Sequence, residues 1–340
     1  MLCARSPLRI DFVGMTDYHV ACDQFGGRIL NATINKYIYA TLQPRDDRRI
    51  VLRAPDQGVV VEVADPAELD ADGQLGLVQH IIRRMGIDQG IELTTYSEMP
   101  GGAGLGSSST IATCVISILS AFTGHRLTNF DIAEMAIECE KAALKTEYGW
   151  QDQYSPVTGG GVKYMVHWPR TDSRDIEIDI LPLGPEVIVE IEKRMVVAYS
   201  GISRPAKGIL DKVAQGVASE DPGVIVALKG MSECAEEMRR ALLRSRLEDL
   251  GPLLGQTWEY HKQLHPDVTN ECLDRLHACA RQNGATGGRV CGAGGGGTMI
   301  FFCEQNAEYN VKEALKKLDA VVFDFSIDRH GLYMWGDIGS

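Results

Sequence analysis

The feature that most constrains this chain is a glycine-rich segment at residues 100–109. It reads Pro-Gly-Gly-Ala-Gly-Leu-Gly-Ser-Ser-Ser and runs directly into a helical pattern from Thr110. Glycines let a backbone approach a ligand closely, and a helix N-terminus adds unpaired N–H donors and the positive end of the helix dipole. The segment matches neither the P-loop nor the dinucleotide-binding fingerprint. It predicts a loop that cradles phosphate, against the alternative of a serine-capped glycine turn without a ligand.

A second segment lies near the N-terminus, where residues 7–18 read as an apolar strand that ends in Gly14 and then presents Thr16, Asp17 and Tyr18. Hydroxyl and carboxylate groups of this kind are suited to hydrogen bonding with the hydroxyls of a ligand. The alternative is an ordinary strand-to-loop turn with a solvated aspartate. The segment alone leaves both interpretations open.

Two carboxylates follow the phosphate-loop candidate. Glu140 lies in a helix expected over 129–144, with Asn129 as its N-cap, and Asp152 lies in a loop expected over 149–154. A metal–nucleotide site needs one carboxylate that holds magnesium and another that accepts a hydroxyl proton. The alternative is that these side chains are solvated and bind nothing.

A further glycine-rich stretch, residues 291–298, lies between two predicted strands. It is either a flexible hairpin or a wall against which a ligand packs, and the residues alone do not decide between the two.

The order of predicted elements is strands, then helices, then strands again. Strands are expected over 28–42, 49–53, 59–63, 160–167, 176–181 and 195–199, helices over 74–85, 105–122, 129–144, 205–217, 224–245, 247–263 and 270–283, and two pairs of strands separated by a helix over 286–335. This order predicts an α+β fold rather than a regular series of βαβ units. The length suggests two domains, 1–180 and 181–340.

The composition excludes several classes of partner. The 340 residues carry a formal net charge of −12, which repels polyanions and disfavours nucleic acid and anionic membranes as partners. No apolar run is long enough for a membrane-spanning helix, and the first residues lack the apolar region of a signal peptide. Nine cysteines without a CxxC pair predict reduced thiols in the cytoplasm.

Taken in this order, the segments resemble the GHMP kinase superfamily, which includes galactokinase, homoserine kinase, mevalonate kinase and phosphomevalonate kinase. Residues 100–108 match its PxGxGLGSS signature at every fixed position. The other motifs lie at the family's positions, so the resemblance spans nearly the whole chain. It implies an N-terminal domain like ribosomal protein S5 domain 2 and a ferredoxin-like C-terminal domain. ATP would bind in the cleft between them, in a syn conformation.

Within the superfamily, residues 25–37, 151–154 and 199–204 look like the D-glycero-D-manno-heptose 7-phosphate kinase group. Those enzymes phosphorylate the anomeric hydroxyl to give a 1,7-bisphosphate on the way to nucleotide-activated heptose. The resemblance therefore implies a phosphotransferase with an alcohol acceptor that uses ATP and Mg²⁺, with a small sugar or sugar phosphate as its partner. It is compatible with a homodimer.

The resemblance also implies roles for single residues. Asp152 is expected to act as catalytic base or orienting group, and Arg9 to steady the developing charge. Ser108 and Glu140 are expected to hold the magnesium ion. The ATP phosphates would lie against Pro100, Gly101, Gly102, Ala103, Gly104, Leu105, Gly106, Ser107, Ser108 and Ser109. The acceptor would contact Thr16, Asp17, Tyr18, Gln151, Tyr199, Gly294 and Gly295.

One departure from the heptose kinases concerns the substrate. They read GGGTD after the first strand, whereas residues 14–17 here read Gly-Met-Thr-Asp, one residue shorter. The change keeps open a kinase for fucose, galactose or a sugar of specialised metabolism. A decarboxylase of this fold and a silent sugar-responsive regulator are further alternatives, disfavoured by the 151–154 segment and by the complete set of candidate catalytic residues. Arg204 and Lys207 are candidates for binding a substrate phosphate.

Overall fold

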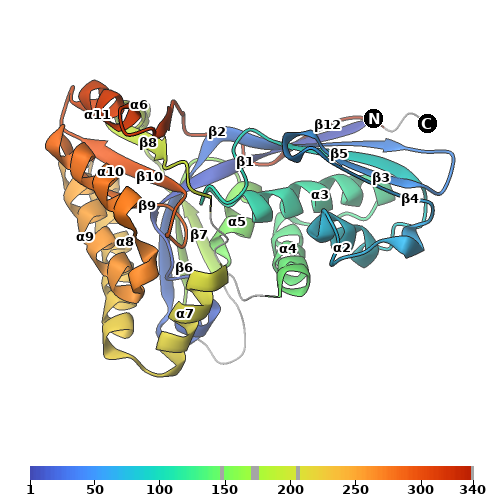
Figure 1. The fold of residues 1–340 in the computed structure, drawn as a ribbon, viewed down its shortest axis with the longest axis horizontal. Coiled ribbons are helices and arrows are strands. Elements are labelled where there is room, and N and C mark those ends of the chain that lie inside the picture. The colour runs from blue at the N-terminus through green and yellow to red at the C-terminus, as the bar shows by residue number, and fades with distance from the viewer. Residues whose placement is uncertain (146–148, 170–175, 204–206, 338–340) are drawn as a thin grey trace.

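The computed structural model describes residues 1–145, 149–169, 176–203 and 207–337. Two β-sheets, each covered by helices, lie side by side along the long axis of the molecule (Figure 1). Strands dominate the first half of the chain and helices the second, with strands returning at the end, so the predicted α+β class is confirmed.

Within the described residues, the larger sheet has eight strands and is centred on two long antiparallel neighbours, β1 (Leu2–Val13) and β2 (Gly27–Pro44). Its order is β12-β1-β2-β5-β3-β4, and β6 and β7 extend from β2. The remaining strands are β3 (Ile50–Ala54), β4 (Val59–Val63), β5 (Ile91–Ser97), β6 (Val162–His167), β7 (Ile176–Ile180) and β12 (Tyr333–Gly336). The predicted hairpin is confirmed, because β3 and β4 pair antiparallel around Gly58, whose φ of 66° suits a glycine turn.

The smaller sheet is antiparallel and has the order β11-β8-β10-β9. Its strands are β8 (Met195–Tyr199), β9 (Ala285–Val290), β10 (Thr298–Cys303) and β11 (Val321–Phe323). Strands β8 and β10 are buried along their whole length, which explains their unbroken apolar sequences.

Helices cover both sheets. Under the larger sheet lie α2 (Gly76–Arg84), α3 (Ser107–Thr123) and α4 (Asn129–Leu144) (Figure 1). The others are α1 (His19–Phe25), α5 (Gln151–Val157), α6 (Pro185–Arg194), α7 (Lys207–Ala218), α8 (Pro222–Leu243), α9 (Leu250–Leu264), α10 (Glu271–Gln282) and α11 (Glu308–Lys316). Helix α3 is apolar on nearly all sides because it packs against β1, β2 and α4 at once. This burial fixes the position of the glycine-rich segment that precedes it.

Four local predictions differ from the structure. The N-cap of α4 is Thr128 rather than Asn129, because the Thr128 hydroxyl accepts the Asp131 N–H in a capping box. A loop was expected over 149–154, but residues 151–157 form α5 despite Pro156, since the turn is buried by its neighbours. Helices α1 and α6 were not predicted. Helix α1 has seven residues and so gives little periodic signal, whereas α6 has ten residues and a buried apolar face that its sequence could have revealed.

The final described strand, β12, pairs antiparallel with β1 in the larger sheet, with Cys3 opposite Trp335. The chain therefore returns to its first sheet after completing the second. The predicted domain boundary between residues 180 and 181 stays a prediction. Strand β12 belongs to the larger sheet of the first half of the chain, although it follows that boundary in the sequence.

Candidate active site

A cavity of about 280 Å³ lies where the two sheets meet. Its walls come from β1, the loop before α3, α4, the start of α5 and the loop between β9 and β10. Among the predicted site residues, the cavity is lined by Arg9, Asp17, Gly102, Gly104, Gly106, Ser107, Ser108, Ser109, Glu140, Gln151, Asp152 and Gly294. The sequence segments that were singled out separately thus meet at one place.

The loop before α3 presents donors to this cavity. Gly106 takes φ 77° and ψ 23° as the residue before the helix, and Gly104 takes φ 76°. Within the described part of the chain, the N–H groups of Gly102, Gly104 and Gly106 donate to no backbone acceptor. The buried Ser107 hydroxyl likewise has no partner among the described residues. Unpaired donors at and before a helix N-terminus suit the phosphates of a nucleotide.

Arg9 and Asp152 form the strongest ion pair of the cavity. Arg9 Nε donates to Asp152 Oδ1 (2.7 Å), and its second terminal nitrogen donates to Asp152 Oδ2 (2.9 Å). The other terminal nitrogen of Arg9 donates to the Gly104 carbonyl (2.5 Å). Burial alone would lower the pKa of Arg9, but Asp152 and Asp11 outweigh it and hold that pKa above its ordinary value. The bidentate pair orients the Asp152 side chain, which is 26% exposed to the cavity.

Glu140 reaches the same cavity from α4 and is almost fully buried. Burial raises its pKa, while hydrogen bonds with Ser108, Ser109 and Gln153 oppose that rise. Gln153 Nε2 donates to Glu140 Oε2 at 2.5 Å. A carboxylate beside serine hydroxyls is an oxygen-only donor set, which is the set that Mg²⁺ prefers. Ser108 and Glu140 therefore fit the predicted metal.

Asp17 lies at the other side of the cavity and is buried. Its Oδ2 accepts the N–H of Gln151 (3.0 Å) at the start of α5. Burial is the main cause that raises the pKa of Asp17 to about 6, and the Gln151 hydrogen bond opposes it. A Cβ on Gly149 would lie 1.9 Å from Asp17 Oδ2, so only glycine leaves room for the carboxylate. Asp17 is thus held in a fixed position at the edge of the cavity, close enough to Asp152 for the two charges to interact.

The loop between β9 and β10 closes the cavity from the smaller sheet. Gly292 N–H donates to Asp11 Oδ1 (3.1 Å), and Arg289 approaches the same carboxylate at 3.5 Å. Asp11 and Arg289 are both fully buried, and Asp11 also lies 4.0 Å from Arg9. Charges of alternating sign therefore run from Asp152 through Arg9 and Asp11 to Arg289. This row joins the catalytic candidates on the larger sheet to the smaller sheet.

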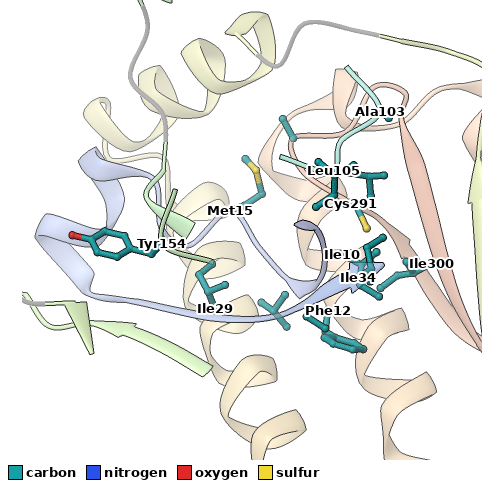
Figure 2. Packing of buried hydrophobic residues seen from close by; sticks show 14 of the residues in the cluster. Ile10, Phe12, Met15, Ile29, Ile34, Ala103, Leu105, Tyr154, Cys291 and Ile300 are labelled. Atoms are coloured by element: carbon teal, nitrogen blue, oxygen red, sulfur yellow. The ribbon is translucent and has the colours of Figure 1, made fainter. Parts of the chain in front are cut away.

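Some predicted residues lie elsewhere. Among the residues that the structure describes, Pro100, Gly101, Ala103 and Leu105 do not line the cavity. Ala103 and Leu105 instead point into the apolar core with Cys291 and Ile300 (Figure 2). The predicted acceptor contacts Thr16, Tyr18, Tyr199 and Gly295 are also outside the described lining.

Three of these residues have structural partners of their own. Thr16 Oγ1 donates to the Arg28 carbonyl (2.6 Å), Tyr199 is part of β8, and Gly295 N–H donates to the Val268 carbonyl (2.7 Å). Their assignment as acceptor contacts stays a prediction. Arg204 lies outside the described residues, and Lys207 Nζ donates to the Lys145 carbonyl (2.9 Å).

Sequence reasoning missed Asp11, Met15, Gly149, Gln153 and Arg289. One signal was present for Asp11, since it lies two positions after Arg9 in a strand and must point to the same face. Arg289 is the charged residue in an otherwise small and apolar strand, directly before the glycines. Nothing in the local sequence marks Gly149, because its role depends on contact with Asp17.

The chain is similar to known proteins over almost its whole length. Residues 75–160 match the GHMP kinases N terminal domain, and residues 238–320 match the GHMP kinases C terminal domain. The chain is 33% identical to D-glycero-alpha-D-manno-heptose 7-phosphate kinase of Campylobacter jejuni, over 97% of this chain and 98% of that protein. It is 27% identical to a bifunctional fucokinase/GDP-fucose pyrophosphorylase of Arabidopsis thaliana, over 90% of this chain and 31% of that protein.

The fold is matched by solved structures as well. The crystal structure of a D-glycero-D-manno-heptose 1-phosphate kinase from Bacteroides thetaiotaomicron superposes with a TM-score of 0.81, at 26% identity and 99% coverage of both chains. The two-domain architecture expected from the resemblance is therefore confirmed. Separately, the described helices include none with the length and apolar character needed to cross a membrane.

Proposed function

The chain belongs to the GHMP kinase superfamily and is a sugar kinase that transfers phosphate to an alcohol, and from this premise we propose that its acceptor is D-glycero-D-manno-heptose 7-phosphate. The product would be the 1,7-bisphosphate, formed at the anomeric hydroxyl, for nucleotide-activated heptose synthesis. The main support is the 33% identity to the Campylobacter jejuni enzyme over almost the whole length of both chains. The reaction would take place in the cavity between the two sheets.

The observation that carries the mechanism is the bidentate Arg9–Asp152 pair beside the donor-rich loop. We infer that Asp152 receives or orients the proton of the acceptor hydroxyl while Arg9 holds its carboxylate in place. Phosphoryl transfer demands little covalent chemistry from the protein, so positioning and charge neutralisation supply most of the rate. Gly102, Gly104 and Gly106 would bind the ATP phosphates through their N–H groups, together with the Ser107 hydroxyl.

Magnesium would be held by Ser108 and Glu140. When bound, the ion neutralises charge on the phosphate oxygens. The Gln153 amide orients Glu140 through its 2.5 Å hydrogen bond, and burial keeps competing water away from this side of the cavity. These residues therefore provide a fixed set of oxygen ligands next to the phosphate loop.

Acceptor recognition would rest on Asp17, Gln151 and Asp152. The buried Asp17 carboxylate lines the cavity and is held by the Gln151 N–H, so that it could accept a hydrogen bond from a sugar hydroxyl. Asn31 Nδ2 donates to Gln151 Oε1 (3.4 Å) and so restrains the Gln151 side chain. A ring of sugar hydroxyls matches such a set of fixed polar groups.

A second candidate is a kinase for another sugar, such as fucose or galactose. It is favoured by Met15, which occupies the shortened loop, takes a left-handed φ of 70° and lines the cavity with an apolar side chain. An apolar wall at this position would suit a deoxy sugar such as fucose better than galactose or heptose, because it leaves no partner for a hydroxyl. Similarity to a fucokinase-containing protein adds to this support.

The deciding experiment measures ADP release from Mg-ATP with a panel of acceptors and identifies the products by phosphorus NMR. The panel contains D-glycero-D-manno-heptose 7-phosphate, the corresponding 1-phosphate, sedoheptulose 7-phosphate, mannose, galactose and fucose. Strong turnover on the 7-phosphate alone, with a 1,7-bisphosphate product, supports the proposal. Preferred turnover on fucose or galactose retains the kinase and rejects the heptose.

A further inference from the structure

A cluster of metal-ligating side chains lies outside the active-site cavity, where α1 meets the end of β6. It consists of Cys22, Asp23 and His167, and one ligand atom from each lies within 4.8 Å of the other two. Cys22 and His167 are buried, whereas Asp23 is 54% exposed. Among clusters of three such residues in the described chain, this is the one that the geometry identifies.

The separations suit a small thiophilic cation. Asp23 Oδ1 lies 3.9 Å from Cys22 Sγ and 3.8 Å from His167 Nε2. Tetrahedral zinc has bonds of about 2.0–2.3 Å to nitrogen, oxygen and sulfur, so its ligand atoms lie about 3.3–3.7 Å apart. The two distances to Asp23 are therefore within a few tenths of an ångström of this range, and the third pair, Cys22 and His167, lies within 4.8 Å.

The chemistry of the three groups points in the same direction. Sulfur, imidazole nitrogen and one carboxylate oxygen form a set that selects zinc-like ions over Mg²⁺. His167 presents its Nε2 to the cluster, 3.8 Å from Asp23 Oδ1, and this is the nitrogen that would hold the ion. The exposed Asp23 gives an ion a path from solvent and leaves the fourth position for water.

We propose that Cys22, Asp23 and His167 bind one thiophilic divalent cation of the Zn²⁺ class. The ion joins α1 to β6, two elements that are far apart in the sequence. Cys22 also donates to the Asp17 carbonyl (3.7 Å), so the site lies directly behind the acceptor end of the cavity. It is separate from the oxygen-only site of Ser108 and Glu140 and does not depend on which sugar is the substrate.

The test is titration of the full-length, metal-free protein with Co²⁺ as a spectroscopic probe, followed by displacement with Zn²⁺. Saturating Mg²⁺ and a non-hydrolysable ATP analogue are present throughout, so that the active-site oxygen ligands are occupied. We expect one Co²⁺ per chain, a thiolate-to-metal charge-transfer band in the near ultraviolet, and a rise in Tm on adding Zn²⁺. The absence of a thiolate band would overturn the proposal.

Three variants assign the ligands. Asp23→Ala changes an exposed side chain and should fold normally, while Cys22→Ser and His167→Gln test the buried ligands. Each is expected to weaken Co²⁺ binding by at least about tenfold, since loss of a ligand costs no less than loss of an outer-sphere partner. Cys272→Ser and Asp46→Ala serve as matched controls and should bind as the parent does. Equal binding by Asp23→Ala and the parent, or equal loss in the controls, would contradict the assignment.

Discussion

The cavity is bordered by two glycine-rich loops, one before α3 and one between β9 and β10, and they use their glycines in opposite ways. In the first loop Gly102, Gly104 and Gly106 line the cavity, and their N–H groups donate to no backbone acceptor among the described residues. In the second loop the N–H groups of Gly292, Gly295 and Gly297 are donated to acceptors within the protein.

Glycine content alone therefore does not identify a ligand-binding loop. The first loop precedes a long buried helix and can offer donors to a phosphate because no backbone acceptor among the described residues takes them. The second loop is hydrogen-bonded to the rest of the protein and to the first loop. Gly297 N–H donates to the Ile202 carbonyl (2.8 Å), and Thr298 N–H donates to the Ala103 carbonyl of the first loop (2.8 Å). One loop binds the nucleotide in our proposal, and the other holds that loop in place.

The largest expected effect concerns Asp152, which borders the first loop. Asp152→Asn should lower kcat by about 10²- to 10⁴-fold, because the side chain can no longer accept a proton in the reaction. Nucleotide binding should stay near normal, since the donors of the first loop are unchanged. Steady-state ADP release and the Kd for a fluorescent ATP analogue test the two halves of this prediction. Near-normal turnover would remove Asp152 from its catalytic role.

A substitution of Arg289, which lies just before the second loop, tests whether this part of the smaller sheet stabilises the site. Arg289→Met leaves the fully buried Asp11 without its partner in the smaller sheet, and we expect a loss of about 3–5 kcal/mol in the free energy of unfolding. Chemical denaturation measures it. Arg289→Lys is the control that keeps the charge and should lose less. A variant as stable as the parent would show that Asp11 is held by Gly292 and Arg9 alone.

A matched pair of glycine substitutions compares the loops directly. Gly106 and Gly295 have similar backbone angles, φ 77° and 73°, so alanine costs each about 1–2 kcal/mol of backbone strain. At Gly106 a Cβ would also lie 3.2 Å from the Asp152 carboxyl carbon, so kcat and ATP affinity should fall. At Gly295 we expect a lower Tm with nearly unchanged ATP affinity. The reverse pattern would exchange the roles of the two loops.

The smallest effect is a pH dependence at the acceptor end. Burial raises the pKa of Asp17 to about 6, and sugar binding through this carboxylate needs the ionised form. The acceptor kcat/KM should therefore be half its maximum at about pH 6, approach its full value about one unit above that pH, and fall up to tenfold per unit below it. Asp17→Asn should remove this step. A phosphate on the acceptor titrates near the same pH in both proteins, so the ratio of the two profiles isolates Asp17.

Much of the site was predictable because its chemistry is local. A glycine-rich run followed by a helix implies unpaired donors wherever it occurs, and the carboxylates at 140 and 152 follow it at a fixed spacing. The second glycine loop was left undecided, since its glycines donate to Asp11, Ile202 and Val268, which lie outside the loop and up to 281 positions away. Helix α5 was expected as a loop because a seven-residue turn containing proline has little helical signal without its neighbours.

By itself, the sequence determined the α+β class, and it predicted a phosphate loop and a set of polar groups available for catalysis. These depend on periodicity, glycine backbone freedom and side-chain chemistry, all of which are properties of short segments. Only the tertiary structure decided that Arg9 clamps Asp152, that Arg289 secures Asp11, and that Gly149 makes room for Asp17. Each of these is a contact between distant segments. Their energies depend on burial and on distances of a few ångströms, which the order of residues does not contain.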